Sequence, residues 1–354
     1  MSEPLKIAID TSPLLGGHAR RGIGTYTREL LKALIDRDDV SITRITRRRK
    51  IEKGEFDLIH YPFFDLFFHS LHQRRGQKTI ITIHDVIPLE FPEQYPPGVK
   101  GSLRLIQQKR ALKKVSWVLT DSDYSKAQIV KHLSFPAERI TPVLLAANPD
   151  IVRQSREQIA NTKEKFNFPE KYILYVGDIN YNKNVPQLIK SLKFLPDDVN
   201  LVCVGKNFSS QPIPEWKAIE RQVALSNVSE RVLFCPDVEP EAIEELSAIY
   251  SGAKLYVQPS LSEGFGLPIL EALQCRTPVV STTRGSLPEV GGPAAIYAEP
   301  DAESLAGAIK QVLDWSRTER AERVEKGFQW SQKFSWDKTA EQTTAAYKQA
   351  LELS

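Results

Sequence analysis

The sequence predicts an α/β protein made of two Rossmann-like, doubly wound parallel-sheet domains that face a cleft. Two observations support this prediction. A chain of 354 residues is too long for one ordinary core and suits two domains of about 150–180 residues each. Both halves also alternate short apolar segments with amphipathic ones, which is the rhythm of strands and helices in parallel sheets. We expect the first domain over residues 1–165 and the second over residues 166–335.

Six short apolar segments in each half are the expected strands. In the first half they are Lys6–Asp10, Val40–Ile45, Asp57–Tyr61, Thr79–His84, Trp117–Thr120 and Ile140–Leu145. In the second half they are Tyr172–Gly177, Asn200–Gly205, Val232–Pro236, Ala253–Ser260, Pro278–Ser281 and Ala295–Tyr297. A polar, charged stretch between the two sets, Ala146–Lys171, is the expected connection.

The composition is that of an ordinary soluble globular protein, with 41% hydrophobic and 26% charged residues. The three cysteines are odd in number, far apart and without C-x-x-C spacing, so neither a disulfide framework nor a zinc site is indicated. The N-terminus lacks a basic-then-apolar signal, and no apolar run approaches the ~18 residues of a membrane span. We expect a cytoplasmic protein.

The charge is unevenly shared between the halves. The net charge is +3, but residues 1–150 hold 24 basic and 17 acidic side chains. A basic first half could face anionic lipid, a phosphorylated acceptor or the phosphates of a nucleotide, and it could equally be a solvated surface. The basic run Arg47–Lys50 has the same two interpretations, phosphate contact or plain solvation.

The first strand is followed by a loop rich in glycine, arginine and histidine, Gly16–Gly24, and then by a helix over Thr25–Leu34. Strand, glycine loop and helix in this order build anion sites in α/β folds. Gly22 and Gly24 are therefore candidate site residues, or simply glycines that a tight turn needs. The third glycine of the G-x-G-x-x-G fingerprint is replaced by Thr27, which disfavours a nicotinamide enzyme.

His84 ends the fourth strand of the first half and is followed by Asp85. The carboxyl end of a strand is where open α/β sheets place ligands, so His84 is a candidate functional residue. The alternative is a histidine that caps a turn through Asp85.

The segment Pro96–Lys114 predicts a basic amphipathic helix. Such a helix can lie on a membrane surface, which would make the protein peripheral at the inner membrane. The commoner arrangement, with the apolar stripe packed on the sheet, is the one that we expect. Its apolar residues are Val99, Leu103, Ile106 and Leu112, and its basic residues are Lys100, Arg104, Lys109, Arg110, Lys113 and Lys114.

Two features of the second half indicate a phosphate site. Gly177 ends a strand and allows close approach to the backbone, and Lys183 at the mouth of the next helix is well placed to hold a diphosphate. The stretch Ser262–Leu273 places a glycine turn before a helix that starts near Pro268, so free N–H groups and the helix dipole favour a phosphate. Two carboxylates flank this turn, Glu263 and Glu271, and suit the hydroxyls of a sugar or ribose.

Glu263 and Glu271, eight residues apart around G-F-G-L-P, resemble the E-x7-E motif of the retaining GT-B glycosyltransferases of family 4. The longer string S-E-G-F-G-L-P-x-L-E-A-L, with Pro278–Val280 and Leu287–Val290 after it, makes the resemblance specific. It implies a GT-B fold and a hexosyltransferase that takes mannose or glucose from a nucleotide diphosphate sugar. The acceptor would be a glycan or lipid-linked, in the synthesis of a surface polysaccharide or glycolipid.

The resemblance also assigns roles to residues of the first half and the tail. The H-D dipeptide implies that His84 borders the sugar of the nucleotide sugar. Gly22 and Gly24 would close over its phosphate and over the acceptor. The tail motif Phe334–Trp336 implies that a last helix, 336–354, crosses back to the first domain.

In the second half, the segment Gly177–Asn184 resembles the family's G-x4-[RK]-K-N segment through Gly177, Lys183 and Asn184, with one departure. The family's usual arginine is replaced at both of its positions, by Asp178 and Asn182, so one positive charge on the leaving group is missing. The turns after two further strands would hold the nucleotide base. They contribute Gly205, Lys206 and Val238.

The chemistry of such a transfer needs few side chains. Lys183 and the amides of Gly264, Phe265, Gly266 and Leu267 would stabilise the diphosphate leaving group. Glu271 would accept hydrogen bonds from the ribose hydroxyls and Glu263 from the hexose, while the acceptor proton leaves to the phosphate itself. A covalent role for Glu263 is the weaker alternative.

We expect no cofactor, no metal and no nucleic-acid partner. The spacing of a D-x-D metal pair occurs at Asp121-Ser122-Asp123, but this triplet starts a helix of the first domain. Two other functions stay open. A nucleotide-sugar epimerase can share the fold, and a nucleotide-sugar-binding subunit without turnover would fit the missing arginine.

Overall fold

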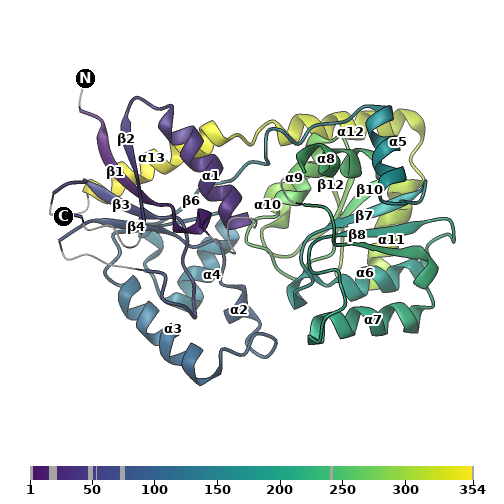
Figure 1. The fold of residues 1–354 in the computed structure, drawn as a ribbon, viewed down its shortest axis with the longest axis horizontal. Coiled ribbons are helices and arrows are strands. Elements are labelled where there is room, and N and C mark those ends of the chain that lie inside the picture. Colours follow the sequence, from purple (N-terminus) through teal and green to yellow (C-terminus); the bar gives the residue numbers. More distant parts are fainter. Residues whose placement is uncertain are drawn as a thin grey trace. The chain divides into compact units, whose positions relative to one another are not determined.

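The computed structural model describes residues 3–15, 22–46, 51–52, 54–71, 76–239 and 242–352. The chain forms two compact units, Met1–Ala146 with Phe334–Ser354 and Ala147–Lys333 (Figure 1). The first unit thus ends earlier in the chain than the sequence suggests, and the last helix belongs to it. Each unit contains one six-stranded parallel sheet, which confirms the prediction of two doubly wound α/β domains.

The first sheet has the strand order β2-β1-β3-β4-β5-β6. All six segments expected in the first half form strands, each with ends within three residues of the prediction. Their bounds are β1 Leu5–Asp10, β2 Val40–Ile45, β3 Leu58–Tyr61, β4 Thr79–Thr82, β5 Trp117–Thr120 and β6 Ile140–Pro142. In the register of the sheet, Ile7 of β1 lies opposite Ile42 of β2 and Leu58 of β3.

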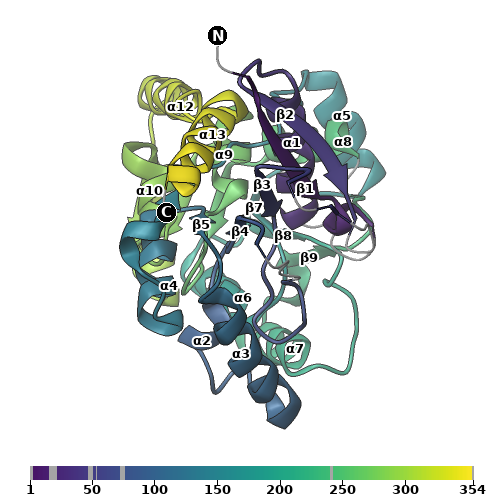
Figure 2. The same ribbon diagram turned by 90° about the vertical axis from the view of Figure 1, so that its left-hand side faces the viewer.

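Helices cover both faces of the first sheet (Figure 2). On one face, His60 of β3 contacts Tyr347 of the last helix. On the other, its neighbour Ile59 joins a buried core with Ile81 and Ile129. This alternation along β3 is expected of a strand that is buried on both faces. The helices are α1 Gly22–Ile35, α2 Ile87–Glu90, α3 Gly98–Leu112, α4 Asp123–Leu133 and α13 Trp336–Glu352.

The second sheet has the strand order β12-β11-β10-β7-β8-β9. The six segments expected in the second half all form its strands. Their bounds are β7 Tyr172–Val176, β8 Asn200–Val204, β9 Val232–Cys235, β10 Leu255–Gln258, β11 Val279–Thr282 and β12 Ala295–Ala298. Since β7 and β10 are neighbours, the loops that follow them leave the same edge of the sheet side by side.

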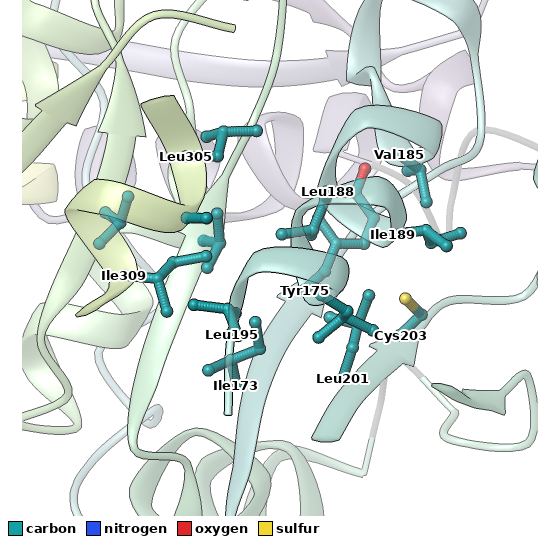
Figure 3. Packing of buried hydrophobic residues seen from close by; sticks show 14 of the residues in the cluster. Ile173, Tyr175, Val185, Leu188, Ile189, Leu195, Leu201, Cys203, Leu305 and Ile309 are labelled. Atoms are coloured by element: carbon teal, nitrogen blue, oxygen red, sulfur yellow. The ribbon is translucent and has the colours of Figure 1, made fainter. Parts of the chain in front are cut away.

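One face of this sheet packs against a core that Figure 3 shows from close by. Ile173 and Tyr175 of β7 lie among Leu188 and Ile309, all without exposed surface. Each buried side chain of this size contributes about 1.5–3 kcal/mol relative to exposure. The helices are α5 Arg156–Lys165, α6 Val185–Ser191, α7 Pro214–Ser226, α8 Ile243–Gly252, α9 Leu267–Gln274, α10 Leu287–Gly291, α11 Ala302–Leu313 and α12 Arg317–Ser331.

The local start signals act as the sequence suggests at α4 but not at α1. Ser122 caps α4, because its Oγ accepts a hydrogen bond from the amide of Ser125 at 3.0 Å. Helix α1 already begins at Gly22, so Gly22 and Gly24 are helical and not part of a loop, which corrects the prediction. The rest of that loop and the basic run 47–50 lie outside the described residues.

Short 3-10 helices complete the secondary structure: η1 Ser12–Leu14, η2 Ala137–Arg139, η3 Tyr181–Lys183, η4 Leu192–Phe194, η5 Ser229–Arg231 and η6 Gly292–Ala294. Among the residues that the structure describes, no helix has the length and apolar character needed to cross a membrane.

Candidate functional site

The second unit brings together Lys183 and Glu263, two of the predicted site residues. Lys183 ends η3 after β7, and Glu263 follows β10, so neighbouring strands deliver them to the same edge of the sheet. The Nζ of Lys183 lies 2.8 Å from both carboxylate oxygens of Glu263. The two side chains are only 22% and 8% exposed. The pair is therefore largely withdrawn from water, where its attraction is weakly screened.

Two further side chains donate to the Glu263 carboxylate. The Nε2 of Gln258 lies 2.8 Å and the Oγ of Ser260 2.7 Å from Oε1. Both are buried, and the hydroxyl of Tyr256 in turn contacts the amide oxygen of Gln258. Sequence reasoning missed these residues. The signal was there, since a glutamine and a serine end an otherwise apolar strand.

The glycine turn before α9 is fixed from the loop that follows β11. The hydroxyl of Ser286 donates to the carbonyls of Glu263 at 3.0 Å and Phe265 at 2.7 Å. Gly285 packs so closely that a Cβ there would lie 2.5 Å from the amide nitrogen of Glu263. Gly266 has φ +112°, and no side chain caps the first turn of α9, which starts at Leu267. This leaves the positive end of the α9 dipole without a capping side chain.

Glu271 lies one turn inside α9, where the hydroxyl of Tyr250 donates to its Oε2 at 2.7 Å. Burial raises the pKa of the Glu271 carboxyl, and the hydrogen bond from Tyr250 opposes this shift only in part. Holding the ionised form here costs free energy, which hydroxyl donors from a ligand would offset.

Gly177 and Gly205 follow the neighbouring strands β7 and β8 and pack directly on each other. A Cβ at Gly205 would lie 2.1 Å from the carbonyl oxygen of Gly177, so no other residue fits there. Lys206 projects beyond this contact, with its Nζ 3.8 Å from Oε2 of Glu239, and it is 58% exposed. Val238 is buried.

Asp178 and Asn182, the two positions without the family's usual arginine, both make hydrogen bonds within the second unit. Asp178 accepts hydrogen bonds through Oδ1 from the amide of Ile179 and from Nδ2 of Asn207. Asn182 is buried and donates through Nδ2 to the carbonyl of Ser262 at 2.9 Å. Asn182 therefore ties the loop after β10 to the loop after β7, so its amide acts on the position of Glu263.

The first unit holds the remaining candidate, His84, which follows β4. Its Nδ1 lies 2.8 Å from Oδ2 of Asp121, and its Nε2 lies 3.1 Å from the carbonyl of Pro62. Burial alone would lower the pKa of His84. The charge and hydrogen bond of Asp121, the charge of Asp85 and the Pro62 carbonyl together outweigh it and raise the pKa. Both ring nitrogens face acceptors, which favours the doubly protonated imidazolium.

The carboxylate of Asp85 also holds the next turn, since its Oδ1 accepts a hydrogen bond from the amide of Ile87 at 3.0 Å at the start of α2. The ring of Tyr26, in the α1 helix that Gly22 begins, meets the His84 ring edge-on with centroids 4.7 Å apart. The start of α1 and the end of β4 are thus close within the first unit.

In the described part of the chain, no three His, Cys, Asp or Glu side chains lie close enough together to hold a metal. Of the Asp121-Ser122-Asp123 triplet, Asp121 pairs with His84 and Asp123 opens α4.

Comparison with protein-family models gives two matches. Residues 157–330 match the family described as glycosyl transferases group 1, and residues 42–150 match glycosyltransferase family 4.

Two curated relatives and one solved structure are similar to the chain. The O-antigen chain mannosyltransferase B of Escherichia coli is 31% identical over 286 residues, 77% of this chain and 71% of that protein. The O-antigen chain mannosyltransferase RfbU of Salmonella typhimurium is 30% identical over 246 residues, 69% of this chain and 63% of that one. The sucrose-phosphate synthase (tll1590) of Thermosynechococcus elongatus superposes with a TM-score of 0.75 at 22% identity, covering 99% of this chain and 100% of that one.

Proposed function

We propose a function from the premise that this chain belongs to the group 1 glycosyl transferases, glycosyltransferase family 4, and has a GT-B fold. The protein is a hexosyltransferase that uses a nucleotide diphosphate sugar and a glycan or lipid-linked acceptor. We propose mannose as the sugar, with glucose second, and a surface polysaccharide or glycolipid as the product. The names of two relatives, both O-antigen chain mannosyltransferases, support mannose and a polysaccharide. We further propose that the anomeric configuration is retained.

The observation that supports this best is the buried Lys183–Glu263 pair beside the glycine turn of α9. A nucleotide sugar carries two phosphates next to a ring of hydroxyls, and this site offers a cation, a helix start and a carboxylate within one sheet edge. Because Lys183 is paired with Glu263, a diphosphate would share or replace this carboxylate partner.

The chemistry follows from the charges. As the bond from sugar to diphosphate breaks, negative charge grows on the leaving group, and Lys183 and the amides of Gly264–Leu267 stabilise it. Glu263, already oriented by Gln258 and Ser260, accepts from hydroxyls of the hexose, and Glu271 accepts from the ribose. The acceptor proton leaves to the departing phosphate. No protein nucleophile and no metal is required.

For the other predicted residues we propose positioning roles. The Gly177–Gly205 contact lets the nucleotide approach the backbone, while Lys206 and the Val238 segment border the base. The first unit binds the acceptor, and His84, with Gly22 and Gly24 of the same unit, contributes to sugar binding.

The test is a thermal shift of the intact chain with GDP, UDP and ADP in EDTA, followed by hydrolysis and transfer with the matching nucleotide hexoses. We expect one nucleotide to raise the melting temperature by several degrees, and Lys183→Ala and Glu271→Ala to remove the shift. Lys190→Ala, an exposed lysine of α6, is the matched control.

The outcomes separate the alternatives. The anomeric configuration of the released hexose is measured by NMR. If it is the same as in the nucleotide sugar, the result supports retention. Binding without hydrolysis or transfer supports a nucleotide-sugar-binding subunit, and recovery of a changed nucleotide sugar supports an epimerase. A chain that binds no nucleotide contradicts the proposal.

A further inference from the structure

The two carboxylates beside the glycine turn of α9 have different partners. Glu263 faces the ammonium of Lys183. Glu271 has no cation beside it among the described residues, and its one side-chain partner there is the hydroxyl of Tyr250, which lies 2.7 Å from Oε2. A carboxylate accepts hydrogen bonds at both of its oxygens, so Oε1 of Glu271 is left for a ligand.

The donor to Glu271 is held rigidly. Tyr250 belongs to α8, and its side chain has no exposed surface, so it cannot touch a bound ligand itself. Its backbone carbonyl accepts a hydrogen bond from Oγ1 of Thr277 at 2.7 Å. Its ring meets the ring of Tyr256 edge-on, with centroids 5.8 Å apart. Because the ring is fixed in this way, its hydroxyl restricts the rotation of the carboxyl group that it holds.

Glu271 differs from Tyr250 in its access to solvent, since its side chain is only half-buried. A ligand can therefore meet this carboxylate while the tyrosine holds it from inside the unit. Two vicinal hydroxyls suit such an acceptor, because hydrogen bonds to a charged oxygen are stronger than those to a neutral one.

We propose that Tyr250 is a positioning residue for nucleotide binding: its hydroxyl holds Oε2 of Glu271, so that Oε1 is presented to the vicinal hydroxyls of the ribose. This role depends on the proposed function, because that proposal assigns the ribose to Glu271. It adds the residue that orients the carboxylate, which acts without touching the nucleotide.

The same hydrogen bond acts on the charge of Glu271. Burial raises the pKa of this carboxyl and the Tyr250 hydroxyl lowers it, so loss of the hydroxyl should raise the pKa further. The other titratable groups near the pair are Tyr256 of β10 and Cys275 after α9, and burial raises the pKa of both, so both are neutral at pH 7. Within the described ranges, no charged group of α10, α12 or β11, which also pack on α9, acts on Glu271.

The test uses the full chain with whichever of GDP, UDP and ADP binds the wild type most tightly, and with the 2′,3′-dideoxy form of that nucleotide. The wild type should bind the dideoxy form about tenfold more weakly, because hydrogen bonds to a charged acceptor are lost. Tyr250→Phe should bind the ribonucleotide about fivefold more weakly, because Glu271 is no longer oriented, and the dideoxy form as the wild type does. Calorimetry measures the four affinities.

Tyr172→Phe is the matched control. Tyr172 is another fully buried tyrosine, and its hydroxyl donates at 2.7 Å to the carbonyl of Ile249, next to Tyr250 in α8. This variant loses a comparable buried hydrogen bond but not the donor to Glu271, so it should keep the tenfold ratio between the two nucleotides.

A second measurement needs no nucleotide. The carboxyl signal of Glu271, in chains with ¹³C-labelled glutamate and assigned through Glu271→Gln, is followed by NMR as the pH is raised. Its midpoint should lie at higher pH in Tyr250→Phe than in the wild type, and it should be unchanged in Tyr172→Phe.

The outcomes separate this role from the transferase proposal. A tenfold ratio that Tyr250→Phe leaves unchanged, or an equal loss for both nucleotides, would overturn the positioning role. The same Glu271 midpoint in Tyr250→Phe and wild type would also overturn it, whatever the nucleotides do. A wild type that binds both nucleotides equally would instead contradict the ribose role of Glu271 in the proposed function, and the role of Tyr250 in nucleotide binding would fall with it.

Discussion

Each unit of the molecule places an ion pair at the carboxyl ends of two neighbouring parallel strands. In the second unit it is Lys183 with Glu263, after β7 and β10, and in the first it is His84 with Asp121, after β4 and β5. Both pairs are 2.8 Å apart and mostly buried. They differ in chemistry, since the cation of one pair is a lysine ammonium and that of the other is a histidine ring, the side chain that titrates near neutral pH.

The surroundings widen this difference. The carboxylate of Glu263 receives extra hydrogen bonds from Gln258 and Ser260, so it keeps its place when a ligand engages Lys183. The second ring nitrogen of His84, Nε2, instead lies 3.1 Å from the carbonyl oxygen of Pro62. The corresponding sheet edges thus hold a lysine–carboxylate pair with extra donors in the second unit and a histidine–carboxylate pair in the first.

The largest expected effect comes from removing the cation of the second unit. Lys183→Ala should lower kcat for transfer about 10³-fold, about 4 kcal/mol, because the leaving group loses its positive charge. The rate at which the nucleoside diphosphate is released measures this kcat. Arg37→Ala removes a cation of a surface ion pair in the first unit and should leave kcat unchanged. A Lys183→Ala enzyme whose kcat lies within fivefold of the wild-type value would contradict the proposed role of Lys183 at the leaving group.

Glu271→Gln should weaken nucleotide binding about tenfold, because a neutral amide accepts hydroxyl donors less strongly than a carboxylate. The same change should raise the melting temperature at pH 7. The folded-state pKa of Glu271 lies above 4.5, so the wild type loses stability as pH rises through it, and the variant does not.

Isothermal calorimetry and melting curves at pH 4.5 and 7 check both parts. A stability gain as large at pH 4.5 as at pH 7 would show that the buried charge is not its cause.

Gln258→Leu tests whether orientation of Glu263 matters. The variant keeps the Lys183–Glu263 pair and the Ser260 donor but loses one of the two donors to Oε1, so kcat should fall about tenfold while the nucleotide Kd stays within twofold. Gln329→Leu, on the surface of α12, is the control. Equal losses in kcat and affinity would mean that Gln258 supports the fold of the site and not the orientation of one carboxylate.

The smallest effect is expected in the first unit and depends on pH. The pKa of His84 is raised in the folded state, so its pair stabilises the protein below the unfolded pKa near 6.5 and is lost as pH rises through the folded value. His84→Gln should therefore cost about 1 kcal/mol at pH 5.5 and less at pH 9.

His132→Gln is the matched control with the opposite sign. Burial lowers the pKa of His132, so the wild type is penalised at acid pH and this variant should gain there. Melting curves from pH 5.5 to 9 record both. Parallel curves for His84→Gln and wild type would show that the His84–Asp121 pair adds no pH-dependent stability.

The sequence alone determined the parts of the molecule that depend on neighbours along the chain. Twelve apolar segments gave the twelve strands, and glycine with polar residues after a strand marked the turns at Gly177, Gly205 and Gly266. Lys183, Glu263 and His84 could be singled out because they follow strands, and parallel sheets collect such positions at one edge. Each of these signals extends over only a few neighbouring residues, so a single sequence is enough to predict the strands, the turns and these candidate residues.

Only the tertiary structure decided which side chains meet. Lys183 and Glu263 are 80 residues apart, and His84 and Asp121 are 37 apart, so no local pattern could pair them or reveal Gln258 and Ser260 as donors. The direction of α3 was decided in the same way. Its apolar spacing gives a stripe, but the hydrogen bonds of Gln108 to the 65–70 segment turn that stripe outward. Packing and buried hydrogen bonds join distant segments, and their free energy fixes what periodicity leaves open.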